Sequence, residues 1–106
     1  MAHLQRLGYA ILGRNVRTRW GELDIVAREG EEFVFVEVKA RVGGPDALPE
    51  ESVTAAKAER LVRLAEAYMS GREGEEPPWR IDVVAVLLGR DGSLRGLRHT
   101  RAAVEA

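Results

Sequence analysis

Two apolar runs, residues 23–27 and 33–40, stand on either side of Gly30 and predict an antiparallel β-hairpin. Gly30 can adopt the positive φ that a tight hairpin turn requires. Each run nevertheless carries an acid, Asp24 in the first and Glu37 in the second, at a position inside the expected strand. This hairpin constrains the chain most, because it fixes both a pair of strands and the place of two charges within a sheet.

Counting outward from the turn places the two carboxylates opposite each other. A turn centred between Gly30 and Glu31 gives the pairs Glu29–Glu32, Arg28–Phe33, Asp24–Glu37 and Glu22–Lys39. Directly opposed residues have Cβ atoms about 4.5–5.5 Å apart, and like charges in that arrangement destabilise a sheet unless something positive lies between them. Carboxylate oxygens on two rigid strands suit a divalent cation. The pattern therefore predicts a Mg²⁺ or Mn²⁺ site between Asp24 and Glu37.

Lys39 offers a second interpretation of the same acids. Period-two alternation puts Glu37 and Lys39 on one face of the second strand. Lys39 would then neutralise Glu37, or Glu22 across the sheet, as an ordinary internal ion pair that contributes little net stability after desolvation. Because Asp24 and Glu37 together outnumber the single lysine, the metal site is the favoured interpretation.

The composition limits the function classes. A length of 106 residues predicts a single domain over residues 1–106. The formal net charge of −1 gives no overall sign of a nucleic-acid binder, so that case depends on where the charges lie. The absence of cysteine excludes disulfides, thiolate nucleophiles and thiolate zinc sites. The longest apolar run, residues 83–88, is far shorter than the roughly 20 residues that span a membrane, so we expect a cytoplasmic protein without a membrane partner.

The remaining segments predict an α/β fold. The expected elements are a short helix over residues 2–7, strands over 9–19, 80–88 and 94–100, a loop over 42–50, and a helix from about 53 or 54 to 71. Because a helix joins the strands at 33–41 and 80–88, these strands are expected to be parallel neighbours in a right-handed crossover. Ser52 or Thr54 is the expected N-cap, and Lys57 begins the apolar stripe of the helix, so it points toward the sheet.

Several of these segments carry a resemblance to known proteins. GELDIVA at residues 21–27 and VFVEVKAR at 34–41, together with residues 13–17, 52–57, 61–68 and 79–86, cover most of the chain. The aspartate, the acid-x-lysine triplet, their spacing and the lysine-bearing helix resemble the signature of the PD-(D/E)xK nuclease superfamily. More closely, the chain resembles the YraN-like family of uncharacterised bacterial proteins, which is related to archaeal Holliday-junction resolvases.

The resemblance implies a restriction-endonuclease-like core, in which a mixed sheet contains an antiparallel hairpin and a β-α-β crossover. It also implies that Asp24, Glu37 and the backbone carbonyl of Val38 are metal ligands, with Lys39 beside the scissile phosphate. Members of the family usually begin with a further helix that carries a glutamate near the metal. We expect this N-terminal helix to be shortened or missing here.

The chemistry expected of these residues is metal-dependent hydrolysis of phosphodiester bonds in DNA, in a branched or single-stranded form. Mg²⁺ between Asp24 and Glu37 would acidify a water and polarise a phosphate oxygen. Lys39 would stabilise the transition-state charge or orient the water. Glu22 is either a ligand of a second metal or a partner of Lys39. Lys57 either reaches the same pocket from the helix N-terminus or covers the apolar stripe with its stem.

Arginine supplies 14 of the 16 basic residues, and some arginines are candidate DNA contacts. These are Arg14, Arg17, Arg19, Arg41 and Arg60. Trp20 either stacks on an exposed base or closes the hairpin corner. A homodimer would place two sites on two DNA strands. The alternative to an enzyme is a non-catalytic module that binds nucleic acid or a protein, and a third class is a purely structural domain.

Three other polar residues are expected to have structural or surface roles. Asp82, early in a buried strand, is expected to anchor Arg80 or another arginine rather than a metal. His3 and His99 have no partners that the sequence identifies, and both are expected at the surface.

Overall fold

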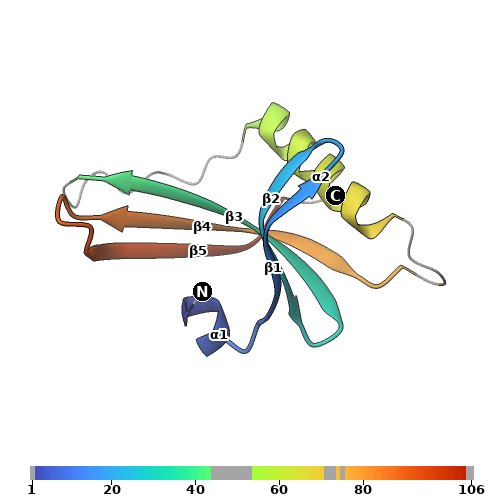
Figure 1. The fold of residues 1–106 in the computed structure, drawn as a ribbon, viewed down its shortest axis with the longest axis horizontal. Coiled ribbons are helices and arrows are strands. Elements are labelled where there is room, and N and C mark those ends of the chain that lie inside the picture. The colour runs from blue at the N-terminus through green and yellow to red at the C-terminus, as the bar shows by residue number, and fades with distance from the viewer. Residues whose placement is uncertain (1, 44–53, 71–73, 75, 105–106) are drawn as a thin grey trace.

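A computed structural model describes residues 2–43, 54–70, 74 and 76–104 of the chain. These residues form one five-stranded mixed sheet, ordered β1-β2-β3-β4-β5, and two helices (Figure 1). The elements are α1 (Ala2–Arg6), β1 (Ala10–Thr18), β2 (Gly21–Glu29), β3 (Glu32–Val42), α2 (Ala55–Met69), β4 (Trp79–Leu88) and β5 (Leu94–Val104). The expected α/β class with a mixed sheet is confirmed.

The β2–β3 hairpin has the predicted register near its turn but not farther out. Its antiparallel ladder contains the pairs Ile25–Val36, Val26–Phe35, Ala27–Val34, Arg28–Phe33 and Glu29–Glu32. The ladder ends before Asp24 and Glu37, so their predicted pairing within it is wrong for the chain as described. The predicted pairing of Glu22 with Lys39 is wrong for the same reason.

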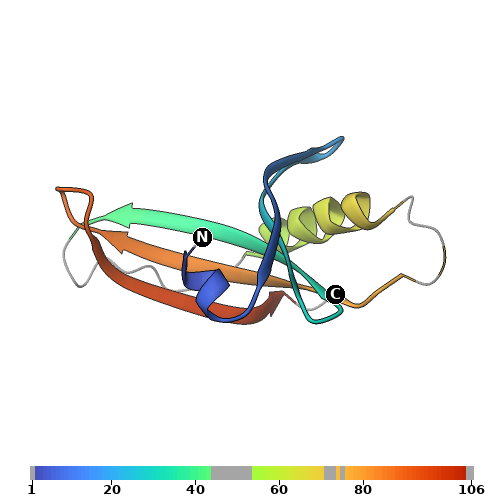
Figure 2. The same ribbon diagram turned by 60° about the horizontal axis from the view of Figure 1, so that its bottom comes forward.

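The two strands separate because β2 remains bonded to β1, and both turn away from β3 toward α2 (Figures 1 and 2). Leu23 of β2 is buried in one cluster with Leu61 and Leu64 of α2. Burial of this apolar surface favours the turn of the β1–β2 hairpin toward the helix. We call the point of separation the fork, and Asp24 lies there.

The crossover through α2 has the predicted outcome, since β3 and β4 are parallel neighbours along their whole length. β5 forms the expected antiparallel edge, but it extends beyond Thr100 to Val104. A register shift in its pairing lies between Ile81 and Val83 of β4. On β5, Ala102 has a φ of 50°, which non-glycine residues rarely adopt.

The helices cover opposite faces of the sheet. On one face, Phe35 packs in a cluster with Leu61 and Leu64 of α2. On the other, Val34 packs with Leu4 of α1. The alternation predicted for β3 is therefore confirmed, and it places Glu37 and Lys39, in phase with Phe35, on the α2 face.

Thr54 is the N-cap of α2, as predicted, because its Oγ1 accepts a 3.2 Å hydrogen bond from the backbone N–H of Lys57. The other candidate cap, Ser52, and most of the expected loop over 42–50 lie outside the described residues. Gly8, with a φ of 90°, follows α1, which ends at Arg6, one residue before the expected end of this helix. Neither helix in the described part of the chain is long and apolar enough to cross a membrane.

Candidate functional site

Asp24 reaches across the fork with its side chain. Its Oδ2 accepts a 2.8 Å hydrogen bond from the backbone N–H of Val38 on β3. The carboxylate thereby satisfies a main-chain donor that has lost its partner strand. Among the described residues, none forms a hydrogen bond or ion pair with Oδ1.

Glu37 follows on β3 and is held by cations from α2. Its Oε1 lies 3.4 Å from Lys57 Nζ and 4.0 Å from Arg60 Nη2. The Glu37 side chain is only 15% exposed. The prediction that Lys57 points toward the sheet is confirmed, and the lysine reaches the acid rather than only covering apolar surface. Within the described chain, Oε2 of Glu37 is the oxygen without an ion-pair partner.

Lys39 and Lys57 lie close together beside Glu37. Burial lowers the pKa of Lys39 below its ordinary value, and the charge of Lys57 and a hydrogen bond with it lower this pKa further. Glu37 opposes the shift, whereas Arg41 adds to it. Two neighbouring ammonium groups repel each other, so the arrangement is stabilised by an anion in contact with both.

The two acids line one narrow crevice on the α2 face. Asp24 and Glu37 share it with apolar side chains that include Leu61. Across the described ranges, no group of three or more His, Cys, Asp or Glu residues is placed to hold a metal ion. Any ion here would take two carboxylates from the protein and complete its coordination with other oxygens.

The backbone carbonyl of Val38 is a third oxygen near these two acids. Its N–H points toward Asp24, on the side of β3 that faces β2. In an extended strand the N–H and C=O of one residue point toward the same edge. Because β2 has left the ladder at this point, the Val38 carbonyl faces the fork, beside the Asp24 carboxylate.

Glu22 lies outside this arrangement. It is exposed on β2, opposite Arg17 of β1, and its Oε2 is 3.9 Å from Arg17 Nε. The predicted pairing of Glu22 with Lys39 is therefore wrong, and the partner of Glu22 is Arg17. An exposed pair of this kind contributes little to stability.

The five predicted DNA-contacting arginines are all exposed, but they do not form one cluster. Arg60 lies near Glu37, and Arg41 is close enough to influence Lys39. Arg19 lies at the tip of the β1–β2 hairpin beside Trp20. Arg14 lies farther along β1, opposite Ile25. In the described chain no ion pair joins Arg14 to the fork.

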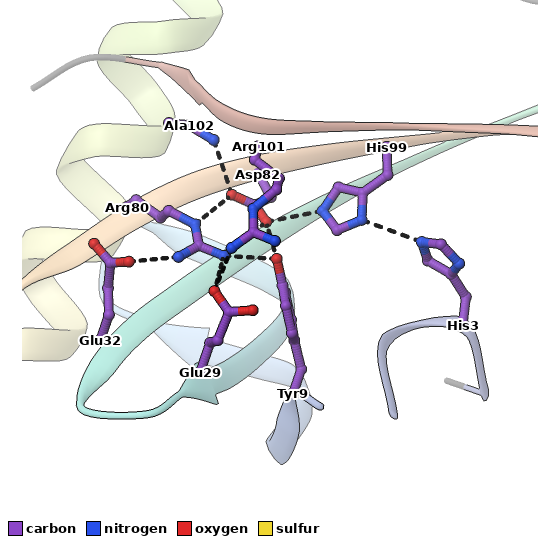
Figure 3. Close-up of polar contacts among 9 residues, drawn as sticks. All are labelled: His3, Tyr9, Glu29, Glu32, Arg80, Asp82, His99, Arg101 and Ala102. Carbon is purple, nitrogen blue, oxygen red and sulfur yellow. Dashed lines mark hydrogen bonds and ion pairs between the residues drawn. The ribbon is translucent and has the colours of Figure 1, made fainter. Parts of the chain in front are cut away.

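A second polar cluster lies on the face of the sheet opposite α2 (Figure 3). Its centre is Asp82, whose side chain is fully buried. Oδ1 accepts hydrogen bonds of 3.0 Å from Arg80 Nε and from the backbone N–H of Ala102. Oδ2 accepts hydrogen bonds from the hydroxyl of Tyr9 at 3.0 Å and from Nε2 of His99 at 2.8 Å. We call this set the Asp82 network.

Hydrogen bonds also constrain the tautomers of two histidines beside this network. Since a carboxylate only accepts hydrogen bonds, His99 Nε2 carries a proton. In a neutral His99 ring, Nδ1 then accepts the 3.1 Å hydrogen bond from Nε2 of His3 on α1. Burial lowers the pKa of His3, and the charges of His99 and Arg6 lower it further.

The structure confirms one prediction about these residues and contradicts another. Asp82 does anchor Arg80, as expected. The surface role predicted for His99 is wrong, because its side chain is 8% exposed and is bonded to Asp82. His3 is also half-buried and bonded rather than free at the surface. The pairing joins residues on α1 and β5, near opposite ends of the chain, and no local pattern signals it.

Comparison with known proteins places the chain in a family. It is 53% identical over 88 residues to a UPF0102 protein of Symbiobacterium thermophilum, covering 83% of this chain and 75% of that protein. It is 47% identical over 104 residues to a UPF0102 protein of Chloroflexus aurantiacus, covering 97% of this chain and 83% of that protein. For a UPF0102 protein of Roseiflexus castenholzii the identity is 43% over 103 residues, with 96% and 83% covered.

The family profile gives the same result. The profile described as "Uncharacterised protein family UPF0102" matches residues 1–86, which include the fork, α2 and most of β4. The resemblance to YraN-like bacterial proteins is thereby confirmed. The chain belongs to the uncharacterised protein family UPF0102.

Proposed function

We propose that this protein is a metal-dependent nuclease that hydrolyses phosphodiester bonds in DNA. The observation that carries the proposal is the meeting of two carboxylates and two ammonium groups at the fork. Acids that hold a cation and lysines that hold an anion are the two halves of a site for a metal-bound phosphate. An ordinary ion pair would need only one of each.

The residues at the fork fit Mg²⁺ or Mn²⁺. Asp24 Oδ1, Glu37 Oε2 and the Val38 carbonyl are hard oxygen donors at one place, and no protein contact of the described chain occupies the two carboxylate oxygens. Magnesium is commonly bound by one or two carboxylates, with water and substrate phosphate completing its shell, so a site with two acids suffices. When bound, the ion acidifies an attacking water and polarises a phosphate oxygen.

The basic residues supply the other half of the proposed chemistry. Lys39, two positions beyond Glu37 on the same face of β3, contacts the scissile phosphate and stabilises the negative charge that develops in the transition state. Lys57 orients Glu37 through their ion pair and adds positive charge beside Lys39. Arg60, at the solvent side of Glu37, contacts a neighbouring phosphate.

The fold supports the same proposal by analogy. A mixed sheet whose antiparallel hairpin is followed by a helix and a parallel strand is the arrangement expected of a restriction-endonuclease-like core. In that family of folds the acid-x-lysine triplet lies on the strand corresponding to β3. Fold alone does not establish function, so the weight rests on the side chains at the fork.

A non-catalytic nucleic-acid-binding module is the second candidate. The observation that favours it is the small number of acids, since the described chain offers two and not three carboxylates at the fork. Both candidates require the basic residues. Only the nuclease requires Glu37 to bind a metal ion. A DNA-cleavage assay therefore distinguishes the nuclease from the binding module.

The decisive experiment is a cleavage assay with Mg²⁺ or Mn²⁺ on duplex, flap, single-stranded and four-way-junction DNA. We expect metal-dependent cleavage of at least one branched or single-stranded substrate, and its loss in Glu37→Gln. Glu66→Gln is the matched control, because Glu66 is an exposed acid on α2 away from the fork. Cleavage that persists in Glu37→Gln would remove the proposed centre, and DNA binding without cleavage would favour the module.

Metal binding is tested separately by thermal unfolding. At a Mg²⁺ concentration about ten times the Kd, we expect a stabilisation of about 1.4 kcal/mol, which raises the Tm by about 5 °C or more. The rise should disappear in Asp24→Asn. This variant keeps an acceptor for the Val38 N–H through its amide oxygen and loses only the charge. An equal rise in wild type and Asp24→Asn would contradict the assignment of Asp24.

A further inference from the structure

A hollow of about 260 Å³ lies between the tip of the β1–β2 hairpin and α2. Its lining consists of Trp20 from the hairpin and Ala56, Glu59, Arg60 and Arg63 from α2. Trp20 is 52% exposed, which is unusual for the largest apolar side chain. An exposed aromatic ring and two guanidinium groups therefore line the same hollow.

The indole of Trp20 is held in place by cations. The guanidinium carbons of Arg19 and Arg63 each lie 5.4 Å from the centre of the ring. Such contacts are attractive because the ring face carries negative potential. Arg63 is itself oriented by Glu59, whose Oε1 accepts a 3.1 Å hydrogen bond from its Nη2. Two guanidinium groups thus lie beside the indole that lines the hollow.

Trp20 is not required to close the hairpin corner. Thr18 does this with its hydroxyl, which accepts a 3.1 Å hydrogen bond from the backbone N–H of Trp20 and donates a 2.9 Å bond to the carbonyl of Gly21. Gly21, with a φ of 141°, supplies the backbone conformation of the turn. These contacts involve the main chain of residue 20 and not its indole, so the side chain is left for another role.

The hollow adjoins the fork. Arg60 lines the hollow and also lies 4.0 Å from Oε1 of Glu37. A nucleotide bound at the fork by its phosphate would therefore have a neighbouring nucleotide within reach of Trp20. In Figure 2 the tip of the β1–β2 hairpin rises above the sheet on the side of α2, consistent with the ring contact to Arg63.

We propose that this hollow binds an unpaired nucleobase of single-stranded DNA, stacked on Trp20, with Arg60 and Arg63 contacting the flanking phosphates. The inference rests on the proposed function, which supplies DNA as the ligand. It adds that the bound base is unpaired. Every base has a π face, so stacking on an aromatic ring tolerates any sequence. Bases within a duplex already stack on both sides, and the hollow consequently selects DNA with an unpaired nucleotide next to the fork.

The test is a binding measurement in EDTA, which needs no cleavage. The fluorescence anisotropy of a fluorescein-labelled dT12 oligonucleotide, and of a labelled blunt 12-base-pair duplex, is followed while wild type or Trp20→Leu is added. We expect dT12 to bind Trp20→Leu about 5- to 150-fold more weakly than wild type, which is the range for one lost stack. Affinity for the duplex should change much less.

Two further variants make the test specific. Trp20→Phe keeps a smaller aromatic face and should recover part of the dT12 affinity. Leu94→Ala, which alters an apolar residue of similar exposure at the start of β5, should leave dT12 binding unchanged. Both are compared after their unfolding curves show an intact fold.

The outcomes separate this inference from the proposed function. Tight dT12 binding that depends on Trp20 supports the stacking site even if no substrate is cleaved. Equal affinity of wild type and Trp20→Leu for dT12, or no dT12 binding at all, overturns it, and cleavage found in the other assay would then leave the nuclease intact without this subsite.

Discussion

Asp82→Ala is expected to lower the free energy of unfolding by about 3–5 kcal/mol, a large part of the 5–15 kcal/mol typical of a domain. The buried carboxylate accepts hydrogen bonds from Arg80, Tyr9, His99 and the backbone of Ala102. Removing it leaves these donors without an acceptor in a region closed to water, and each loses the free energy of its hydrogen bond without regaining hydration.

Urea unfolding followed by circular dichroism measures this loss. Arg101→Ala is the matched control, because Arg101 pairs with Glu29, which also lies 3.1 Å from Arg80 Nη2, but the Arg101 side chain is 54% exposed. An exposed ion pair contributes at most about 1 kcal/mol. If Asp82→Ala proved as mild as Arg101→Ala, the Asp82 network would not be what holds β4, β5 and β1 together.

The pH dependence gives an independent check. Burial raises the pKa of the Asp82 carboxyl, but hydrogen bonds from Arg80, Ala102 and His99 outweigh burial and hold the pKa below its ordinary value. A carboxyl whose pKa is lowered on folding stabilises the protein above its unfolded pKa of about 4, and this contribution is lost as the pH falls through the folded pKa. The difference in stability between wild type and Asp82→Asn should therefore be largest near neutral pH and should shrink below about pH 4. A difference that grew on acidification would contradict this sign.

Lys39→Ala is expected to slow cleavage about 100- to 1000-fold at saturating Mg²⁺. This is the effect of removing one group that stabilises the charge of a transition state. The Mg²⁺-dependent rise in Tm should persist, since Lys39 is not among the proposed ligands. Loss of rate with retention of metal binding distinguishes Lys39 from Asp24, whose substitution should abolish both.

Single-turnover cleavage of the best substrate in the panel provides the measurement. Arg95→Ala removes one positive charge from an exposed position on β5 and controls for general weakening of DNA attraction. A rate for Lys39→Ala within a few-fold of that control would exclude Lys39 from the reaction.

The parts of the fold that the sequence predicts correctly are those set by local periodicity. The alternation along β3 identified its two faces, the position of Lys57 on the helix followed from spacing, and Thr54 was one of the two expected caps. The parallel pairing of β3 with β4 followed from the helix expected between them. The faces of β3, the cap and the position of Lys57 depend on residues close together in the chain.

Two features were not predictable in this way. The fork arises because β2 is drawn toward α2 by burial of Leu23, which is a tertiary contact, so counting from the turn paired Asp24 with Glu37 in a ladder that ends earlier. The burial of His99 depends on His3 and Asp82, which approach it only when α1 and β5 are in place. Periodicity assigns a face to a residue but does not name its partner on that face.

The location of the two polar clusters on opposite faces of the sheet has a consequence for how this protein can vary. Side chains that share no partners contribute to stability nearly independently. Substitutions at the fork are therefore expected to leave the stability contributed by the Asp82 network unchanged. The side chains at the fork can therefore be exchanged without loosening the contacts that join β4 to β5 on the opposite face.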